Sequence, residues 1–160
     1  MITNEFLEQA CSEVSEYSDD RMLLEFDTFF QEQPAICDFV VEATHDSEPR
    51  IQELSLFLAY MICKAVKAGK PDPVHIVTPQ MIETAYRDSE HWIDQIGQAE
   101  EPQMEEISTK LEADAEPNLI QYVIAELNSP PEDGVELEDE EKGEVFFVLK
   151  TVISSLARRP

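Results

Sequence analysis

Two carboxylate–histidine pairs have a spacing that suits metal binding. Glu42 precedes His45 by three residues, and Asp88 precedes His91 by three residues. Residues three apart share one face of a helix, so each pair can offer a carboxylate and an imidazole to one ion. Four-helix di-iron proteins use two such pairs. The alternative interpretation of this chain is therefore a metal-binding helical-bundle protein or metalloenzyme.

The remaining ligands of such a site have only nominal candidates. Di-iron bundles add one Glu from each of two further helices, and Glu25 and Glu53 can fill those places. However, His45 falls at the end of a helix of about ten residues, whereas di-iron sites lie in the middle of long helices. A carboxylate three residues before a His is also expected by chance among 35 acidic residues. We therefore expect no resident metal or other cofactor.

Other catalytic patterns are missing from the sequence. Four scattered glycines cannot form the closely spaced loop that cradles phosphate or a dinucleotide. There is no Gly-x-Ser-x-Gly elbow, and Cys11, Cys37 and Cys63 lie in segments with helical apolar periodicity, where thiols are usually buried. These observations favour a protein without enzymatic activity.

The charge balance is the most unusual property of the chain. Its 35 acidic and 11 basic residues give a net charge of −24, and residues 100–144 hold 16 acids against two lysines. Such a field repels nucleic acid and anionic membranes and attracts basic proteins. The function we expect is a non-enzymatic protein-interaction or regulatory module with an acidic surface, and a basic protein is the candidate partner that the charge suggests. The charge excess by itself is explained most simply by acids that solvate the surface.

The elements that must position these residues are all predicted to be helices, because no segment alternates with period two over the length of a strand. Prolines and Ser or Thr caps mark most helix starts. The first helices are expected at about 4–17, 18–33, from Pro34 to about 43, and 48–68, the last stopping at Gly69. The others are expected at 79–96, ending at a left-handed Gly97, then from Pro102, from Pro117 and over 140–158.

Three helices have apolar patterns that bear on interactions. The second is predicted to bury Met22, Leu23, Phe26, Phe29 and Phe30, and the fourth is apolar nearly all round, as central helices are. The last helix carries five consecutive apolar residues, 145–149, so it is either central or forms the seam of a homodimer. Candidate interaction residues are Trp92, Phe146 and Phe147, each with core packing as the alternative.

The chain is predicted to be one all-α domain over 1–160, with seven to eight helices in an irregular bundle or a short stacked helical-repeat-like array. Prolines followed by an apolar residue recur at helix starts, and segments 18–69 and 79–129 are a candidate pseudo-repeat. An acidic loop is expected at 128–139. We expect no membrane span, because no apolar run approaches 18 residues. Without a signal-peptide pattern after Met1, we expect a cytoplasmic location.

Overall fold

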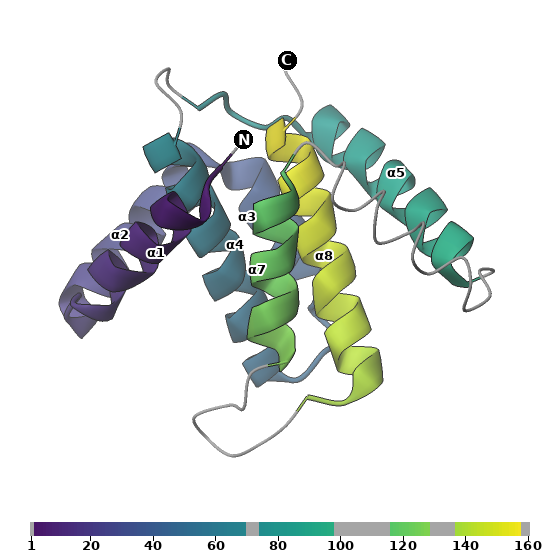
Figure 1. The fold of residues 1–160 in the computed structure, drawn as a ribbon, viewed down its shortest axis with the longest axis horizontal. Coiled ribbons are helices and arrows are strands. Elements are labelled where there is room, and N and C mark those ends of the chain that lie inside the picture. The colour runs from purple at the N-terminus through teal and green to yellow at the C-terminus, as the bar shows by residue number, and fades with distance from the viewer. Residues whose placement is uncertain (1, 70–73, 98–115, 129–136, 158–160) are drawn as a thin grey trace.

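The computed structural model describes residues 2–69, 74–97, 116–128 and 137–157. Within these ranges the chain forms seven α-helices and no strand, which confirms the all-α prediction. The helices, with their labels in Figure 1, are α1 (Asn4–Ser15), α2 (Asp19–Glu32), α3 (Pro34–Ala43), α4 (Pro49–Gly69), α5 (Pro79–Gly97), α7 (Pro117–Asn128) and α8 (Asp139–Ala157).

The helices begin where local chemistry satisfies their free backbone amides. Thr78 Oγ1 accepts a hydrogen bond from the amide of Met81 at 3.2 Å, and Ser18 Oγ accepts from the amide of Arg21 at 3.2 Å. Both are side-chain N-caps, as the sequence predicts. Pro34 occupies the first turn of α3, where its missing N–H costs no intrahelical bond.

Two long helices form the centre of the bundle. In Figure 1, α8 runs between α7 and α5, and α4 lies beside α7 toward α1. Helix α8 packs on α3, α4, α5 and α7, while α4 packs on α1, α3 and α8. Five consecutive residues of α4, 58–62, and six of α8, 148–153, are buried, so both helices are enclosed on every side over these turns. This confirms the predicted central position of the fourth helix and favours the central alternative for the last one.

A buried glutamine fixes the connection that leads into α5. Gln33 Nε2 donates to the carbonyl of His75 at 3.0 Å, and its Oε1 accepts from the amide of Val77 at 3.0 Å. His75 Nε2 lies 3.4 Å from the carbonyl oxygen of Ser155 in α8. A single side-chain amide therefore pairs with an extended segment as a neighbouring strand would, and it satisfies backbone groups near the core.

Several predicted boundaries need correction. Helix α1 ends at Ser15 rather than at Tyr17. After Ser15 the backbone turns through Glu16 toward Ser18, the N-cap of α2. Gly69 does not follow α4 as a stop signal but is its last residue. A Cβ at this position would lie 2.5 Å from Cδ1 of the buried Ile2, so close packing explains the glycine.

Other predictions fall on residues that the structure does not describe. The helix expected from Pro102 lies in 98–115, and most of the expected acidic loop 128–139 lies in 129–136. The second half of the candidate pseudo-repeat, 79–129, includes the first of these gaps, so the repeat stays a prediction. None of the described helices is long and apolar enough to cross a membrane.

Candidate functional site

The outward side of α2 exposes large apolar side chains beside acidic ones, and the apolar ones are not needed to solvate the surface. Leu23 and Leu24 are 70% and 65% exposed, and Phe30 is 40% exposed. Asp19, Asp20 and Asp27 are also exposed. We call this set the α2 outer face, made of Asp19, Asp20, Leu23, Leu24, Asp27 and Phe30.

Helical spacing arranges these residues in two rows along α2. Asp19, Leu23 and Asp27 follow one another at four-residue steps, and Phe30 continues that row one turn later. Asp20 and Leu24 form the neighbouring row with the same step. Each exposed leucine therefore has an aspartate one turn before it on the same side of the helix.

The opposite side of α2 anchors the helix to the bundle. The Phe26 and Phe29 rings lie 5.1 Å and 5.9 Å from the ring of Tyr60 in α4, measured between centroids. Phe29 is buried, and α2 also packs on α3. Because these aromatic contacts fix the rotation of the helix, Leu23 and Phe30 are turned outward.

This outcome corrects the predicted buried face of the second helix. The sequence grouped Leu23 and Phe30 with Met22, Phe26 and Phe29, but the structure buries only the last of these and partly buries Met22 and Phe26. A usable signal was present: apolar residues cover too wide an arc of α2 for one packing face. Leu24, nearly opposite the buried side, was missed for the same reason.

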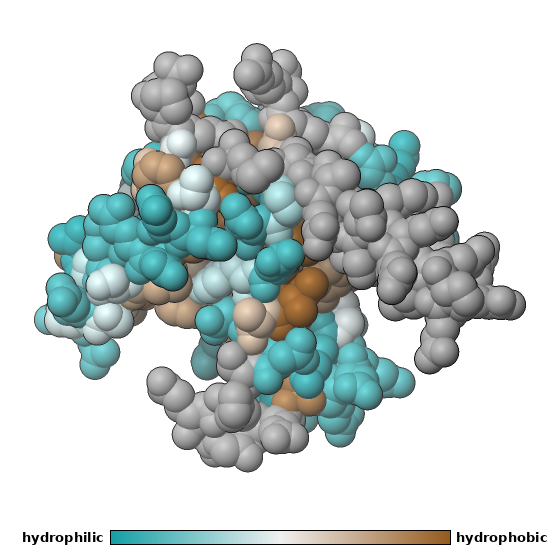
Figure 2. Space-filling view, in the orientation of Figure 1, coloured by the Kyte–Doolittle hydropathy of each residue, from teal (hydrophilic) through white to brown (hydrophobic). Residues whose placement is uncertain are grey.

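The charge around the α2 outer face is strongly negative. Residues 4–33 contain nine acids and one base, Arg21. The Arg21 guanidinium lies 3.7 Å from Glu25 and stacks 5.0 Å from the centroid of the Tyr17 ring. Figure 2 shows the α1 and α2 side of the molecule, on the left, as mainly hydrophilic with paler and apolar residues among the polar ones. The only cation of these helices is thus engaged within the fold.

The structure does not gather the predicted metal ligands. His45 lies beyond the end of α3, its side chain is 68% exposed, and its Nε2 is 3.2 Å from Asp46 Oδ1. Glu42, on α3, and the pair Asp88 and His91, on α5, have exposed side chains.

The two nominal glutamates are placed differently. Glu53 is exposed on α4, while Glu25 lies 3.5 Å from Lys64. No three His, Cys, Asp or Glu side chains in the described part of the chain are grouped to hold a metal ion.

The predicted interaction residues have three outcomes. Phe146 is partly buried and packs against the core. Phe147 is half-buried and makes an edge contact with Tyr86 of α5, with 5.0 Å between ring centroids. Tyr86 in turn contacts Phe39 of α3 at 6.2 Å. Both phenylalanines thus make packing contacts within this chain, and their role in an interaction stays a prediction. The side chain of Trp92 lies outside the described residues.

The cysteines are poor candidates for nucleophilic chemistry. All three are free thiols. Burial raises the pKa of Cys37 to about 12 and also raises the pKa of Cys63. Burial raises the pKa of Cys11 as well, although its thiol lies 3.9 Å from the Tyr122 hydroxyl. These thiols stay protonated near neutral pH, whereas the thiolate is the nucleophile.

Comparisons of the chain with protein families, with curated proteins and with solved structures found no match. The functional argument therefore rests on the α2 outer face and the chemistry around it.

Proposed function

We propose that this chain is a non-enzymatic protein-interaction module whose α2 outer face binds a basic amphipathic segment of a partner protein. One observation carries the proposal: two leucines are about two-thirds exposed on a helix whose neighbouring surface is acidic. Exposed apolar side chains framed by polar residues are typical of protein interaction sites. The free thiols fit the reducing cytoplasm that we propose as its location.

The rows of the α2 outer face indicate the chemistry of the partner. A helix with apolar residues at three- and four-residue steps can cover Leu23, Leu24 and Phe30. Lys or Arg residues beside those apolar residues would face Asp19, Asp20 and Asp27. A second copy of this chain fits less well, because two surfaces of the same sign would meet. The same charge disfavours nucleic acid.

The homodimer predicted through the last helix has less support. The apolar residues of α8 are largely used in contacts with α3, α4, α5 and α7. The dimer remains a prediction about assembly, and light scattering at high protein concentration tests it: a monomer would contradict it.

Photo-crosslinking from single positions tests the proposed function. A photoreactive residue at position 23 is compared with one at Ile76, which is 66% exposed on the segment before α5. In native host extract, position 23 should capture a basic protein and position 76 should not.

The capture must also depend on charge. The triple substitution Asp19→Asn, Asp20→Asn, Asp27→Asn should remove the adduct, whereas Glu90→Gln, Asp94→Asn, Glu126→Gln should leave it, since those acids are exposed on α5 and α7. An adduct with a second copy of this chain, equal capture from position 76, or no adduct at position 23 would overturn the proposal.

A further inference from the structure

The acidic residues of the α2 outer face are unevenly distributed along the helix axis. Asp19 and Asp20 lie in its first turn, and Glu16, exposed just before the helix, adds a third carboxylate at this end. Asp27 lies two turns further on and accepts a hydrogen bond from Gln31 Nε2 at 3.4 Å. The negative charge that a partner can reach is therefore concentrated at the start of α2.

The other end of α2 presents an aromatic ring and an ion pair. Phe30 is 40% exposed, and its ring makes an edge contact with the buried Phe29 ring, with 6.0 Å between the centroids. Lys67 Nζ lies 3.2 Å and 3.3 Å from the two carboxylate oxygens of Glu32, in the last turn. A further cation here would meet a carboxylate that already has one, and the exposed Lys67 ammonium would repel it. This end therefore favours apolar contact.

The length and place of α2 suit a second helix lying along it. Figure 1 shows α1 and α2 together at the left of the bundle, away from α5 and α8. From Asp19 to Phe30 the outer face covers about three turns, roughly 16 Å at about 1.5 Å per residue. A partner segment that forms about three helical turns therefore matches the outer face in length.

The helix macrodipole determines which end of such a partner helix should carry its cations. A helix has a partial positive charge at its first turn and a partial negative charge at its last turn, so Lys and Arg are favourable only in the last turn. To place that last turn over Asp19 and Asp20, the partner must run antiparallel to α2. The antiparallel arrangement also brings opposite ends of the two helix dipoles together.

Resting on the proposed function, we infer that the docking segment of the partner is an amphipathic helix antiparallel to α2, with Lys or Arg grouped in its last turn over Asp19 and Asp20. Its apolar residues, at three- and four-residue steps, cover Leu23 and Leu24. A large apolar residue in its first turn contacts Phe30. A parallel helix would either hold its cations in its first turn, against its own dipole, or place them beside Phe30, where the nearby acid is already paired.

Photo-crosslinking from two positions of the full chain tests the direction of the partner. A photoreactive residue replaces Leu23 in one sample and Phe30 in another, and both are crosslinked in native host extract. Mass spectrometry then identifies the partner residue that each position captures. The residue captured from position 30 should precede the one captured from position 23 by about seven residues in the partner sequence, because helices side by side advance equally. Lys or Arg should follow within about one turn after the residue captured from position 23.

Three results would overturn the antiparallel helix while the proposed function stands. The reverse order of the two captured residues would show a parallel partner. A separation of about three residues would show an extended segment, since a strand rises about 3.3 Å per residue. An adduct from position 23 with none from position 30 would show that the partner does not reach Phe30. No adduct from either position would overturn the proposed function together with this inference.

Two acid-to-amide variants of α2 then locate the cations of the partner. A synthetic peptide with the sequence of the captured segment is titrated against each variant at low salt and followed by fluorescence anisotropy. Asp20→Asn should weaken binding about threefold or more, since it removes a carboxylate that faces the last turn of the partner. Glu32→Gln should change the affinity by less than about twofold, because this carboxylate already pairs with Lys67. Equal losses in the two variants, or a larger loss with Glu32→Gln, would overturn the grouping of cations at the start of α2.

Discussion

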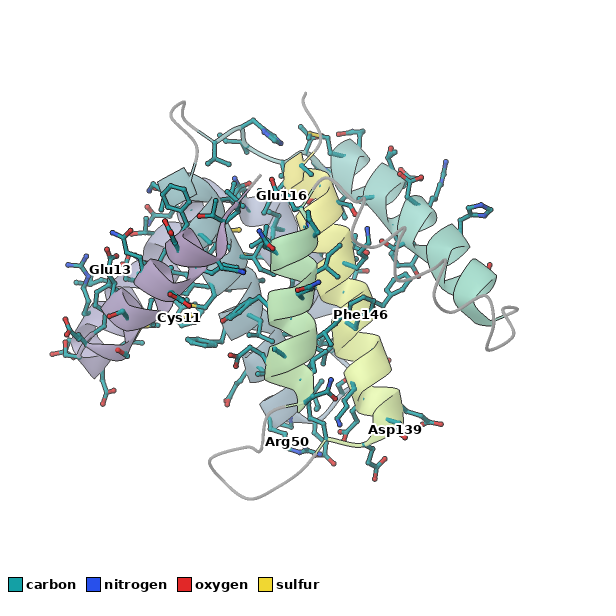
Figure 3. All side chains as sticks on the ribbon, viewed as in Figure 1. Cys11, Glu13, Arg50, Glu116, Asp139 and Phe146 are labelled. Carbon is teal, nitrogen blue, oxygen red and sulfur yellow. The ribbon has the colours of Figure 1, made fainter. Side chains whose placement is uncertain are left out.

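At the scale of single residues, buried polar groups join segments that are far apart in the sequence. Glu116 is 6% exposed, and its Oε2 accepts a hydrogen bond from the amide of Ile2 at 2.7 Å. Asn118 Nδ2 donates to the Ile2 carbonyl at 2.9 Å. Figure 3 shows Glu116 at the start of α7, beside the N-terminal segment. Together these contacts hold the buried Ile2 side chain in the core.

Removal of the Glu116 carboxylate should therefore destabilise the fold. Glu116→Ala leaves the Ile2 amide without that partner, and we expect a loss of about 1–3 kcal/mol in the free energy of unfolding. Urea denaturation measures it. Glu126→Ala is the matched control, because Glu126 is exposed on α7, the helix that Glu116 precedes. Equal stability of the two variants would contradict the role of Glu116.

A second polar contact links the starts of α4 and α8. Arg50 Nη2 lies 3.0 Å and 3.1 Å from the two carboxylate oxygens of Glu141, and Arg50 Nε is 2.7 Å from Glu48. Glu141 Oε1 also accepts from the backbone amide of Glu138 at 2.9 Å, as the third residue of a capping box does. In Figure 3, Arg50 and Asp139 lie at the same end of the bundle. Glu141 thus serves a helix start and an interhelical ion pair.

These contacts predict a pH-dependent contribution to stability. The Glu138 amide, together with Arg50, lowers the pKa of Glu141 despite its partial desolvation. A lowered folded-state pKa gives stability that is present above the unfolded value of about 4.3 and is lost as pH falls through the folded value. Glu141→Gln should therefore lower Tm at pH 7, and its difference from wild type should vanish in strong acid. A difference in Tm that persists in strong acid would argue against this linkage. An equal loss of Tm at pH 7 in the control variant Glu140→Gln would also argue against it.

At the scale of elements, two helical glycines have opposite surroundings. A Cβ built on Gly143 in α8 meets nothing within 4 Å, whereas one on Gly69 in α4 meets Ile2 Cδ1 at 2.5 Å. Ile2 Cδ1 has little room to move aside, because the side chain is only 1% exposed and Glu116 and Asn118 hold the Ile2 backbone. Replacement by alanine should therefore change the stability of the protein in opposite directions at the two glycines.

We expect Gly143→Ala to stabilise the protein by about 0.5–1 kcal/mol, because alanine loses less backbone entropy in a helix than glycine does. We expect Gly69→Ala to destabilise it by about 1–3 kcal/mol through overpacking. Chemical denaturation of both variants checks the pair. A stabilising Gly69→Ala would show that the contact with Ile2 is looser than described.

The helix starts could be predicted from the sequence because their causes are local. Ser18 and Thr78 bond to amides three residues away, and Pro34 restricts its own backbone. The rotation of α2 could not be predicted, because it depends on Phe26 and Phe29 meeting Tyr60 from another helix. Gln33 pairs with backbone groups 42 and 44 residues away, and such a contact leaves no pattern in the sequence.

At the scale of the whole molecule, exposed apolar and acidic side chains lie together on the α2 outer face. The sequence suggested a basic partner from the net charge, and the acid-rich residues 100–144 lie mostly outside the described ranges. The described part of the chain offers the α2 outer face instead. Its aspartates lie on the same rows as its leucines, so in the proposed complex charge and apolar contact would act on one docking segment.

The measurement that tests the central claim most directly is the rate of association between this chain and the protein crosslinked from position 23, followed by stopped flow at increasing ionic strength. Between low salt and about 0.15 M, where the Debye length is about 8 Å, the rate constant should fall roughly tenfold or more. The Asp19→Asn, Asp20→Asn, Asp27→Asn variant should associate slowly at low salt and show little dependence on it. A wild-type rate that does not change with salt would contradict a basic partner on the α2 outer face.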